Sequence, residues 1–321
     1  MRYTARPGIW TQLHTTVTNP DDTDRVVSVL FETEDRSSGK MIFRRTHLLP
    51  ARSQGLVQFA ARPLELGRRD GGQPIRQIAS VLDGPSRTQL ARLGDVMLAP
   101  VPKRLKLLAV LDDRPARDLS YGFLATASGG GTATLVTAPI SHLGDQWYAL
   151  AGVDALALGT LDLDRRRAGQ VRAICDWVSR GGVLILFASD GSVETLSGEL
   201  GDAAGVAVAG AHRVRSLNVR SADGEYQWPV TLDKSADLLN LAVPSAEVLF
   251  SADGAPILTR APYGMGYVFV LALPLNALAQ PPLGKMFKTV RRAMAATPAF
   301  GLGDFADDSL ARLQAVRVGG G

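Results

Sequence analysis

The stretch AICDWVSRGGVLILFAS, residues 173–189, combines the two elements that decide the fold. Apolar side chains at Val171, Ile174, Cys175 and Val178 have the spacing of one helix face, and Asp164 is placed to cap that helix. Gly181 and Gly182 end the helix. The run 183–187 is continuously apolar, as in a strand buried on both faces. The stretch therefore predicts a helix followed by a buried strand.

The same alternation of elements extends on both sides of this stretch. Further strands are predicted at 105–111, 132–137 and 153–158, further helices at 118–127 and 283–295, and a hairpin at 256–273 around the turn 263–266. Residues 206–256 are less regular, and we expect antiparallel strands there. Strand, helix and strand in succession favour parallel pairing with right-handed crossovers. We therefore expect a three-layer α/β/α domain with flavodoxin-like winding over residues 104–298, followed by a tail at 299–321 with one weak helical stretch at 308–315.

The first hundred residues are predicted to form strands only. The expected strands are 9–18, 26–34, 41–49, 54–61, 75–82 and 88–97. Short strands at this spacing, separated by turn signals, favour an immunoglobulin-like β-sandwich over residues 1–100. The stiff sequence Pro100-Val101-Pro102 marks the expected domain boundary.

Composition limits the classes of protein to consider. The chain has 321 residues, of which 46% are hydrophobic and 21% charged, as in a globular protein of two domains. The net charge is only +4, the arginines are scattered and only 6% of residues are aromatic, so no nucleic-acid partner is expected. No apolar window reaches the roughly 18 residues of a membrane span, and no signal core is present. Both ends look abrupt, which suggests an excised fragment and leaves open a membrane tether outside it.

Four segments together resemble a known superfamily. They are LKLLAVLDD (105–113), VDALALG (153–159), AICDWVSRGGVLILFAS (173–189) and APILTRAPYGMGYVFVLAL (255–273). In this order they resemble the class I glutamine amidotransferase-like superfamily, and most closely the domain that follows a β-sandwich in large bacterial envelope proteins. The resemblance covers residues 104–295. It implies a cell-envelope, extracytoplasmic location.

The residues that catalyse the reaction in active members of that superfamily are not matched. Those enzymes place a cysteine on a sharp turn between a strand and a helix, with a histidine and an acid near the C-terminus. The only cysteine here, Cys175, lies in the middle of the predicted helix on its apolar face, and no histidine follows His212. We therefore predict that Cys175 is buried and structural, and that the domain is a pseudoenzyme rather than an enzyme.

A candidate crevice is expected at the carboxyl ends of the parallel strands, where open α/β sheets bind ligands. The residues expected to line it are Asp112, Asp113, Gly159, Thr160, Ser189 and His142. Asp112 and Asp113 could hold Mg²⁺, although the third carboxylate of such a site is missing and Asp162 lies in a loop. Ser189 or Ser192 could serve a hydrolase, as could Ser141 with His142 and Asp145. A small-molecule sensor could use the same crevice.

No metal or cofactor is predicted. The four histidines, His14, His47, His142 and His212, are dispersed and show no metal-ligand spacing. A single cysteine also excludes an internal disulfide framework and a thiolate zinc site within one chain.

These observations favour a non-catalytic scaffold or protein-interaction module of a bacterial cell-envelope protein. Its partner is expected to be another protein, itself associated with the envelope. The alternatives are a hydrolase, a Mg²⁺-dependent enzyme or a small-molecule sensor that uses the crevice.

Overall fold

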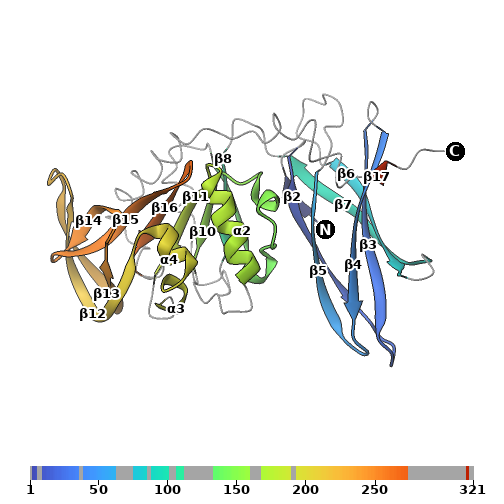
Figure 1. The fold of residues 1–321 in the computed structure, drawn as a ribbon, viewed down its shortest axis with the longest axis horizontal. Helices are drawn as coiled ribbons and strands as arrows, with labels where there is room; N and C mark the ends of the chain where they lie inside the picture. The colour runs from blue at the N-terminus through green and yellow to red at the C-terminus, as the bar shows by residue number, and fades with distance from the viewer. Residues whose placement is uncertain are drawn as a thin grey trace. The chain divides into compact units, whose positions relative to one another are not determined.

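The computed structural model describes residues 2–5, 9–35, 39–62, 75–84, 88–100, 106–111, 133–159, 168–188, 193–273 and 316–317. Contacts within the chain divide it into two units, which Figure 1 shows in ribbon form. Unit 1 contains residues 1–103, 148–152 and 301–321, and unit 2 contains residues 104–147 and 153–300.

The described part of unit 1 is built from strands. They are β1 (Arg2–Ala5), β2 (Thr11–Thr18), β3 (Arg25–Asp35), β4 (Gly39–Leu49), β5 (Gln54–Ala61), β6 (Ile75–Asp83), β7 (Gln89–Pro100) and β17 (Val316–Arg317). One sheet has the order β1-β7-β6-β3-β4-β17, and β2 pairs with β5 in a second sheet. The strands expected from residue 9 to residue 97 are therefore present, with ends that differ by a few residues.

The core of unit 1 lies between its two sheets. Trp10 and Leu13, before and within β2, pack with Phe31 of β3 and Phe43 of β4. A segment far away in the sequence completes this core, because the ring of Tyr148 lies 5.2 Å from that of Trp10 between centroids. Residues 148–152 belong to unit 1 although unit 2 supplies the chain on either side of them. Nothing in the local sequence indicates this packing.

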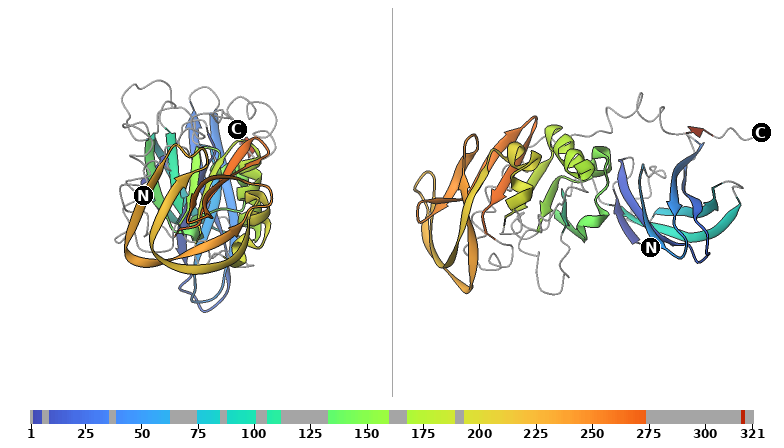
Figure 2. Two further views of the ribbon diagram at one scale, coloured as in Figure 1. Left: turned by 90° about the vertical axis from the view of Figure 1, so that its left-hand side faces the viewer. Right: turned by 60° about the horizontal axis from the view of Figure 1, so that its bottom comes forward.

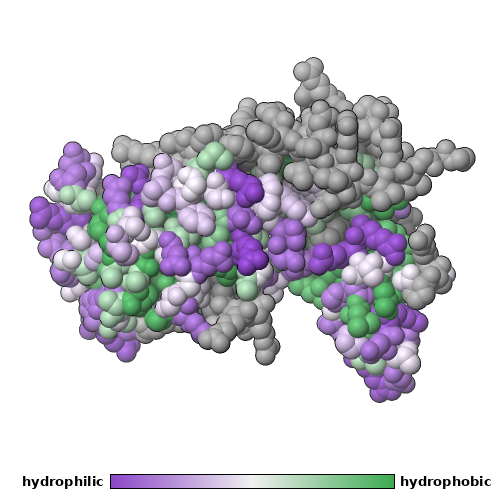
Figure 3. Space-filling model, in the orientation of Figure 1, coloured by the Kyte–Doolittle hydropathy of each residue, from purple (hydrophilic) through white to green (hydrophobic). Residues whose placement is uncertain are grey.

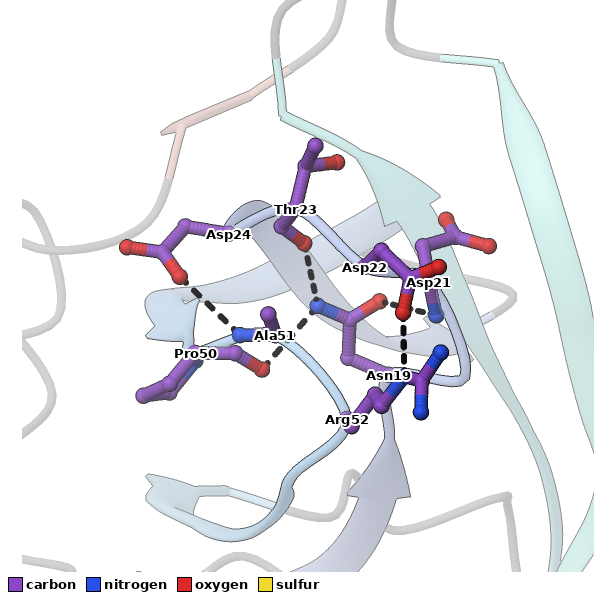
Figure 4. Close-up of polar contacts among 8 residues, drawn as sticks. All are labelled: Asn19, Asp21, Asp22, Thr23, Asp24, Pro50, Ala51 and Arg52. Atoms are coloured by element: carbon purple, nitrogen blue, oxygen red, sulfur yellow. Dashed lines mark hydrogen bonds and ion pairs between the residues drawn. The ribbon is translucent and has the colours of Figure 1, made fainter.

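A buried asparagine joins two turns of unit 1, as Figure 4 shows. Asn19 follows β2 and is 1% exposed. Its amide nitrogen donates to the carbonyl oxygens of Thr23 (2.8 Å) and Pro50 (3.0 Å). Its side-chain oxygen accepts a hydrogen bond from the backbone N–H of Asp21 (3.2 Å). The turn between β2 and β3 is thus fixed to the turn between β4 and β5.

Unit 2 contains one large mixed sheet. Its strands are β8 (Lys106–Leu111), β9 (Ala133–Ala138), β10 (Ala155–Leu158), β11 (Val183–Phe187), β12 (Ala207–Ser221), β13 (Gln227–Ala242), β14 (Glu247–Ala252), β15 (Ala255–Tyr263) and β16 (Gly266–Leu271), in the order β13-β12-β14-β15-β16-β11-β10-β8-β9. The five strands from β16 to β9 are parallel, and the pairs from β13 to β16 are antiparallel. Every residue of β10 and β11 is buried, as the apolar runs predict.

The described helices of unit 2 are α2 (Ala168–Ser179), α3 (Val193–Leu196) and α4 (Glu199–Ala204), with a single 3-10 turn at Ile140–His142. A second 3-10 turn, Trp147–Leu150, lies mostly in unit 1. Helices α2 and α4 contact each other and both contact β16, so they lie on the same face of the sheet, as the left view of Figure 2 shows. Helix α2 buries Ile174, Cys175 and Val178, in agreement with the periodicity. It begins at Ala168; the expected cap Asp164 lies outside the described residues.

The C-terminal end of α2 lies directly on the turn between β15 and β16. The backbone N–H of Met265 donates to the carbonyl oxygen of Ser179 at 2.9 Å, which satisfies a carbonyl that the helix leaves open. Two glycines make this approach possible. Gly264 has a positive φ of 59°, and a Cβ on Gly266 would lie 2.2 Å from the carbonyl oxygens of Gly182 and Val178. The segments 173–189 and 255–273 are therefore linked by backbone contact.

The expected fold class is wrong for unit 2. The immunoglobulin-like sandwich expected for residues 1–100 stays a prediction: unit 1 has two described sheets, of six and two strands, with β1 parallel to β7. Instead of a three-layer α/β/α flavodoxin-like domain, unit 2 has a sheet of nine strands, and its three described helices are short. The error arose because residues 207–263 add antiparallel strands to the sheet itself, which the local pattern of strand and helix does not reveal. The helices expected at 118–127, 283–295 and 308–315 lie outside the described residues.

Replacing Gly266 with alanine is expected to destabilise unit 2 by about 3 kcal/mol or more, because the new methyl group would overlap two backbone oxygens. Chemical denaturation followed by circular dichroism measures the change. Gly169→Ala is the matched control: its Cβ would lie 3.5 Å from the Cβ of Asp145, and a helix residue changes from glycine to alanine. The control should be neutral or more stable than the parent. Equal stability of the two variants would contradict the role given to Gly266.

Asn19→Ala is expected to destabilise unit 1 by about 2–3 kcal/mol, since it leaves buried backbone groups without partners. Asp22→Asn serves as the comparison, because the ion pair of Asp22 with Arg52 in the same corner is exposed and its loss should cost less than about 1 kcal/mol. Urea denaturation of both variants distinguishes the buried from the exposed contribution. A smaller loss of stability for Asn19→Ala than for Asp22→Asn would refute the role given to the hydrogen bonds of Asn19.

Candidate functional site

The predicted crevice falls mostly outside the described residues. This applies to Asp112, Asp113, Thr160 and Ser189, and also to the alternatives Asp162 and Ser192. Gly159 is described: it follows β10, it is buried, and its N–H donates to the carbonyl oxygen of Leu111 at 2.9 Å. The carboxyl ends of β8 and β10 therefore lie side by side, as the parallel pairing requires.

His142 lies after the edge strand β9. It is the last residue of the 3-10 turn Ile140–His142 and is half-buried, while the adjacent Ser141 and the nearby Asp145 are exposed. The described part of the structure does not bring His142 together with the other crevice residues. The combination of Ser141, His142 and Asp145 stays a hypothesis.

The cysteine occupies the place that the sequence predicts. Cys175 is 3% exposed on the inner face of α2. Burial raises the pKa of its thiol to about 12, and the negative charges of Glu199 and Asp176 add to the shift. The thiol therefore stays protonated at neutral pH and cannot act as an activated nucleophile.

Tyr263, at the end of β15, lies in the same surroundings. Its pKa is raised above the usual range, first by burial and then by the negative charges of Cys175 (as a thiolate), Glu199 and Asp176. The surroundings formed by α2, α4 and β15 thus raise the pKa of both Cys175 and Tyr263. This arrangement supplies packing around the thiol rather than a base for it.

A different feature of unit 2 presents functional groups to solvent. Strands β12 and β13 form a long antiparallel ribbon, visible in Figure 2, whose paired residues run from Ala207 with Ala242 to Arg220 with Gln227. Only Val219, Arg220 and Ser221 of β12 also pair with β14 among the described strands. From Ala207 to Ser216 every residue of β12 is exposed or half-exposed. The first two thirds of β12 therefore combine exposed side chains with an edge that no described strand covers.

The tip of this ribbon is held by its own side chains. The hydroxyl group of Ser221 donates to the carboxylate of Asp223, which also accepts the N–H of Glu225 at 3.0 Å. These hydrogen bonds, that of Ser221 first, lower the pKa of Asp223. Next to this turn, the ring of Trp228 at the start of β13 lies 5.8 Å from the ring of Phe250 of β14, between centroids, in an edge-on contact. The ribbon is thus ordered at its end as well as along its strands.

Basic side chains dominate β12. Exposed His212, Arg213, Arg215 and Arg220 lie on this strand, and it carries no Asp or Glu. Arg213 pairs in register with Asp237 and donates to the hydroxyl oxygen of Ser235 at 3.0 Å. In Figure 3 hydrophilic residues line the outer margin of this part of unit 2. The sequence contained a signal only for the end of this strand, since residues 217–220 (LNVR) alternate between apolar and polar side chains.

The described residues offer no metal centre. Among them, no three His, Cys, Asp or Glu side chains lie close enough together to hold an ion. Also within these residues, no helix combines the length and the apolar character needed to cross a bilayer.

Comparison with known proteins places the chain in no family. No family model matches it, and no curated protein matches it. Solved structures with partial similarity include the cytoplasmic proteins STM1381 from Salmonella typhimurium LT2 (TM-score 0.44, 14% identity, 60% of this chain and 96% of that one) and STM3548 from Salmonella typhimurium (TM-score 0.46, 12% identity, 60% and 98%). Another is the exo-β-1,4-mannosidase Op5Man5 from Opitutaceae bacterium strain TAV5, with a TM-score of 0.42, 14% identity, and coverage of 60% of this chain and 36% of that one. These similarities are too low to assign an activity.

Two expectations that rested on the resemblance are corrected. Membership in the class I glutamine amidotransferase-like superfamily is wrong, because unit 2 has one mixed sheet of nine described strands, half of it antiparallel, instead of the expected three-layer α/β/α domain. The cell-envelope location depended on that resemblance alone. It is therefore withdrawn together with the family.

The raised pKa of Cys175 predicts a pH dependence of stability. The folded state holds the thiol proton more tightly than the unfolded state, so stability is fully present below the unfolded pKa of about 9 and falls as the pH rises towards about 12. Cys175→Ala should remove this component. The free energy of unfolding between pH 8 and pH 11 should therefore fall less steeply in the variant than in the parent. Parallel slopes, or rapid alkylation of the native thiol, would show that Cys175 is accessible.

Proposed function

We propose that this protein is a non-catalytic protein-interaction module and that the β12–β13 ribbon is its binding surface. The observation that carries the proposal is the exposure of β12 from Ala207 to Ser216, on both faces of the strand. A strand in a packed sheet normally buries at least one face. Ten consecutive residues of ordered strand with none of them buried are well suited to contact another molecule.

Packing of the neighbouring strand supports this assignment. Leu238, Leu239 and Leu241 of β13 are buried, and the N–H of Leu239 donates to the carbonyl oxygen of Ala272 at 3.2 Å. β13 therefore anchors the ribbon to the rest of unit 2, and β12 is buried only near its C-terminal end, at Leu217, Val219 and Ser221. The surface is preorganised, which lowers the entropic cost of binding.

A second candidate function uses the crevice. The hydrogen bond from Gly159 to Leu111 aligns the ends of β8 and β10, so Asp112 and Thr160 follow neighbouring strands. A Mg²⁺-dependent enzyme, a hydrolase with Ser189, or a small-molecule sensor could be built at this edge of the sheet. Cys175 has no part in these alternatives, because its thiol is buried and protonated.

A site-specific cross-linking experiment separates the two functions. A photoreactive amino acid at Ala209, on β12, is expected to give a discrete covalent adduct with another protein in cells of the source organism. The same amino acid at Arg172, an exposed residue of α2, is the matched control and should give none. The adduct at Ala209 should survive Asp112→Asn combined with Asp113→Asn.

The opposite pattern favours the crevice. Equal labelling at Ala209 and Arg172, or none at Ala209, would contradict binding by the ribbon. A Mg²⁺-induced rise in melting temperature that Asp112→Asn abolishes would establish the metal-dependent alternative.

A further inference from the structure

We propose that β12 binds an acidic, extended peptide segment of its partner by strand addition, along the edge from Gly210 to Val214. This inference rests on the proposed function and deepens it by naming the chemistry of the partner. Strand addition joins backbone N–H and C=O groups of a sheet edge to those of an extended segment.

The edge of β12 has the geometry that strand addition needs. Register shifts interrupt the pairing with β13 between Val208 and Gly210 and between Val214 and Ser216. Between these two irregularities, Gly210–Val214 pairs regularly with Leu238, Leu239 and their neighbours on β13. On the other side, pairing with β14 begins only at Val219 among the described strands. A regular stretch of this length is typical of natural strands.

The side chains beside this edge allow a close approach. Ala207, Ala209, Gly210 and Ala211 are all exposed and carry at most a methyl group. Side chains of a strand stand roughly perpendicular to the sheet, so those of His212, Arg213 and Val214 do not lie between β12 and a second backbone at the roughly 4.8 Å that separates neighbouring strands. Leu238, Leu239 and Leu241 of β13, the strand that pairs with β12 on its other edge, are buried and hold the ribbon in place.

The charges at this edge select an acidic segment. His212, Arg213 and Arg215 follow one another within four residues, and β12 has no carboxylate to offset them. Asp237 lies opposite Arg213 on β13. Cross-strand pairs of opposite charge stabilise a ladder by roughly 0.2–1 kcal/mol each, and like charges destabilise it. A second copy of this chain would bring its own His212, Arg213 and Arg215 to the same short ladder, so the charges also disfavour self-pairing.

Peptide binding to the full chain tests the proposal. The probe is a fluorescent peptide of about eight residues in which Glu and Thr alternate, and its binding is followed by anisotropy. Arg215→Glu should weaken binding by about tenfold or more, because attraction becomes repulsion. Arg172→Glu on α2 makes the same change in net charge away from the edge and should leave the affinity unchanged.

Two altered peptides test the mode of binding. A peptide with Lys in place of Glu should not bind, and a central proline should abolish binding of the acidic peptide, since proline removes a backbone donor. Hydrogen exchange should slow at those amides of Gly210–Val214 that do not bond to β13 when the acidic peptide is bound. If binding survives the proline, or if these amides gain no protection, the peptide is held by surface charge and strand addition is refuted. Protection that grows with protein concentration in the absence of peptide would instead identify a second copy as the occupant and overturn the proposal.

The two proposals fail in different ways. A covalent adduct at Ala209 without binding of the acidic peptide would leave the interaction module in place and remove strand addition by an acidic segment. Peptide binding that Arg215→Glu does not weaken would show that the edge of β12 is not the site. Absence of both the adduct and the peptide complex would refute both proposals.

Discussion

Unit 2 depends on the direct contact between the end of α2 and the turn that joins β15 to β16. Met265 donates its backbone N–H to Ser179, and Gly264 and Gly266 bring the turn against the helix without a side chain between them. This contact fixes where β16 lies, and β16 is the strand that joins the parallel half of the sheet to the antiparallel half. The position of the β12–β13 ribbon follows from it through β15 and β14.

Unit 2 has a buried region around α2 and an exposed strand, β12. The region around α2, α4 and β15 buries Cys175, and it raises the pKa of this thiol and of the half-buried phenol of Tyr263. Strand β12 is exposed or half-exposed from Ala207 to Ser216 and carries Arg213, Arg215 and Arg220 without a carboxylate of its own. Chemistry that needs a polarised, reactive cysteine therefore has no place in the first region, while the second has the exposed edge and charge that recognition uses.

Unit 1 shows the same dependence on contacts between distant residues. Asn19 satisfies backbone groups of two separate turns, and Tyr148 reaches the core from a segment that is remote in the sequence. Both contacts are tertiary. The polar turn residues 19–22 predict a turn, but they do not indicate which second turn the amide of Asn19 will bond.

The sequence by itself determined the local elements. Apolar periodicity located α2, the continuous runs located β8, β10 and β11, and the position of Cys175 on the apolar face of α2 predicted a buried thiol. Only the tertiary structure decided how residues 207–263 extend the sheet, and that β12 stays exposed along an uncovered part of its edge. The physical reason is that hydrophobic periodicity reports whether a face is buried, whereas strand order and open edges depend on hydrogen bonds between segments far apart in the chain.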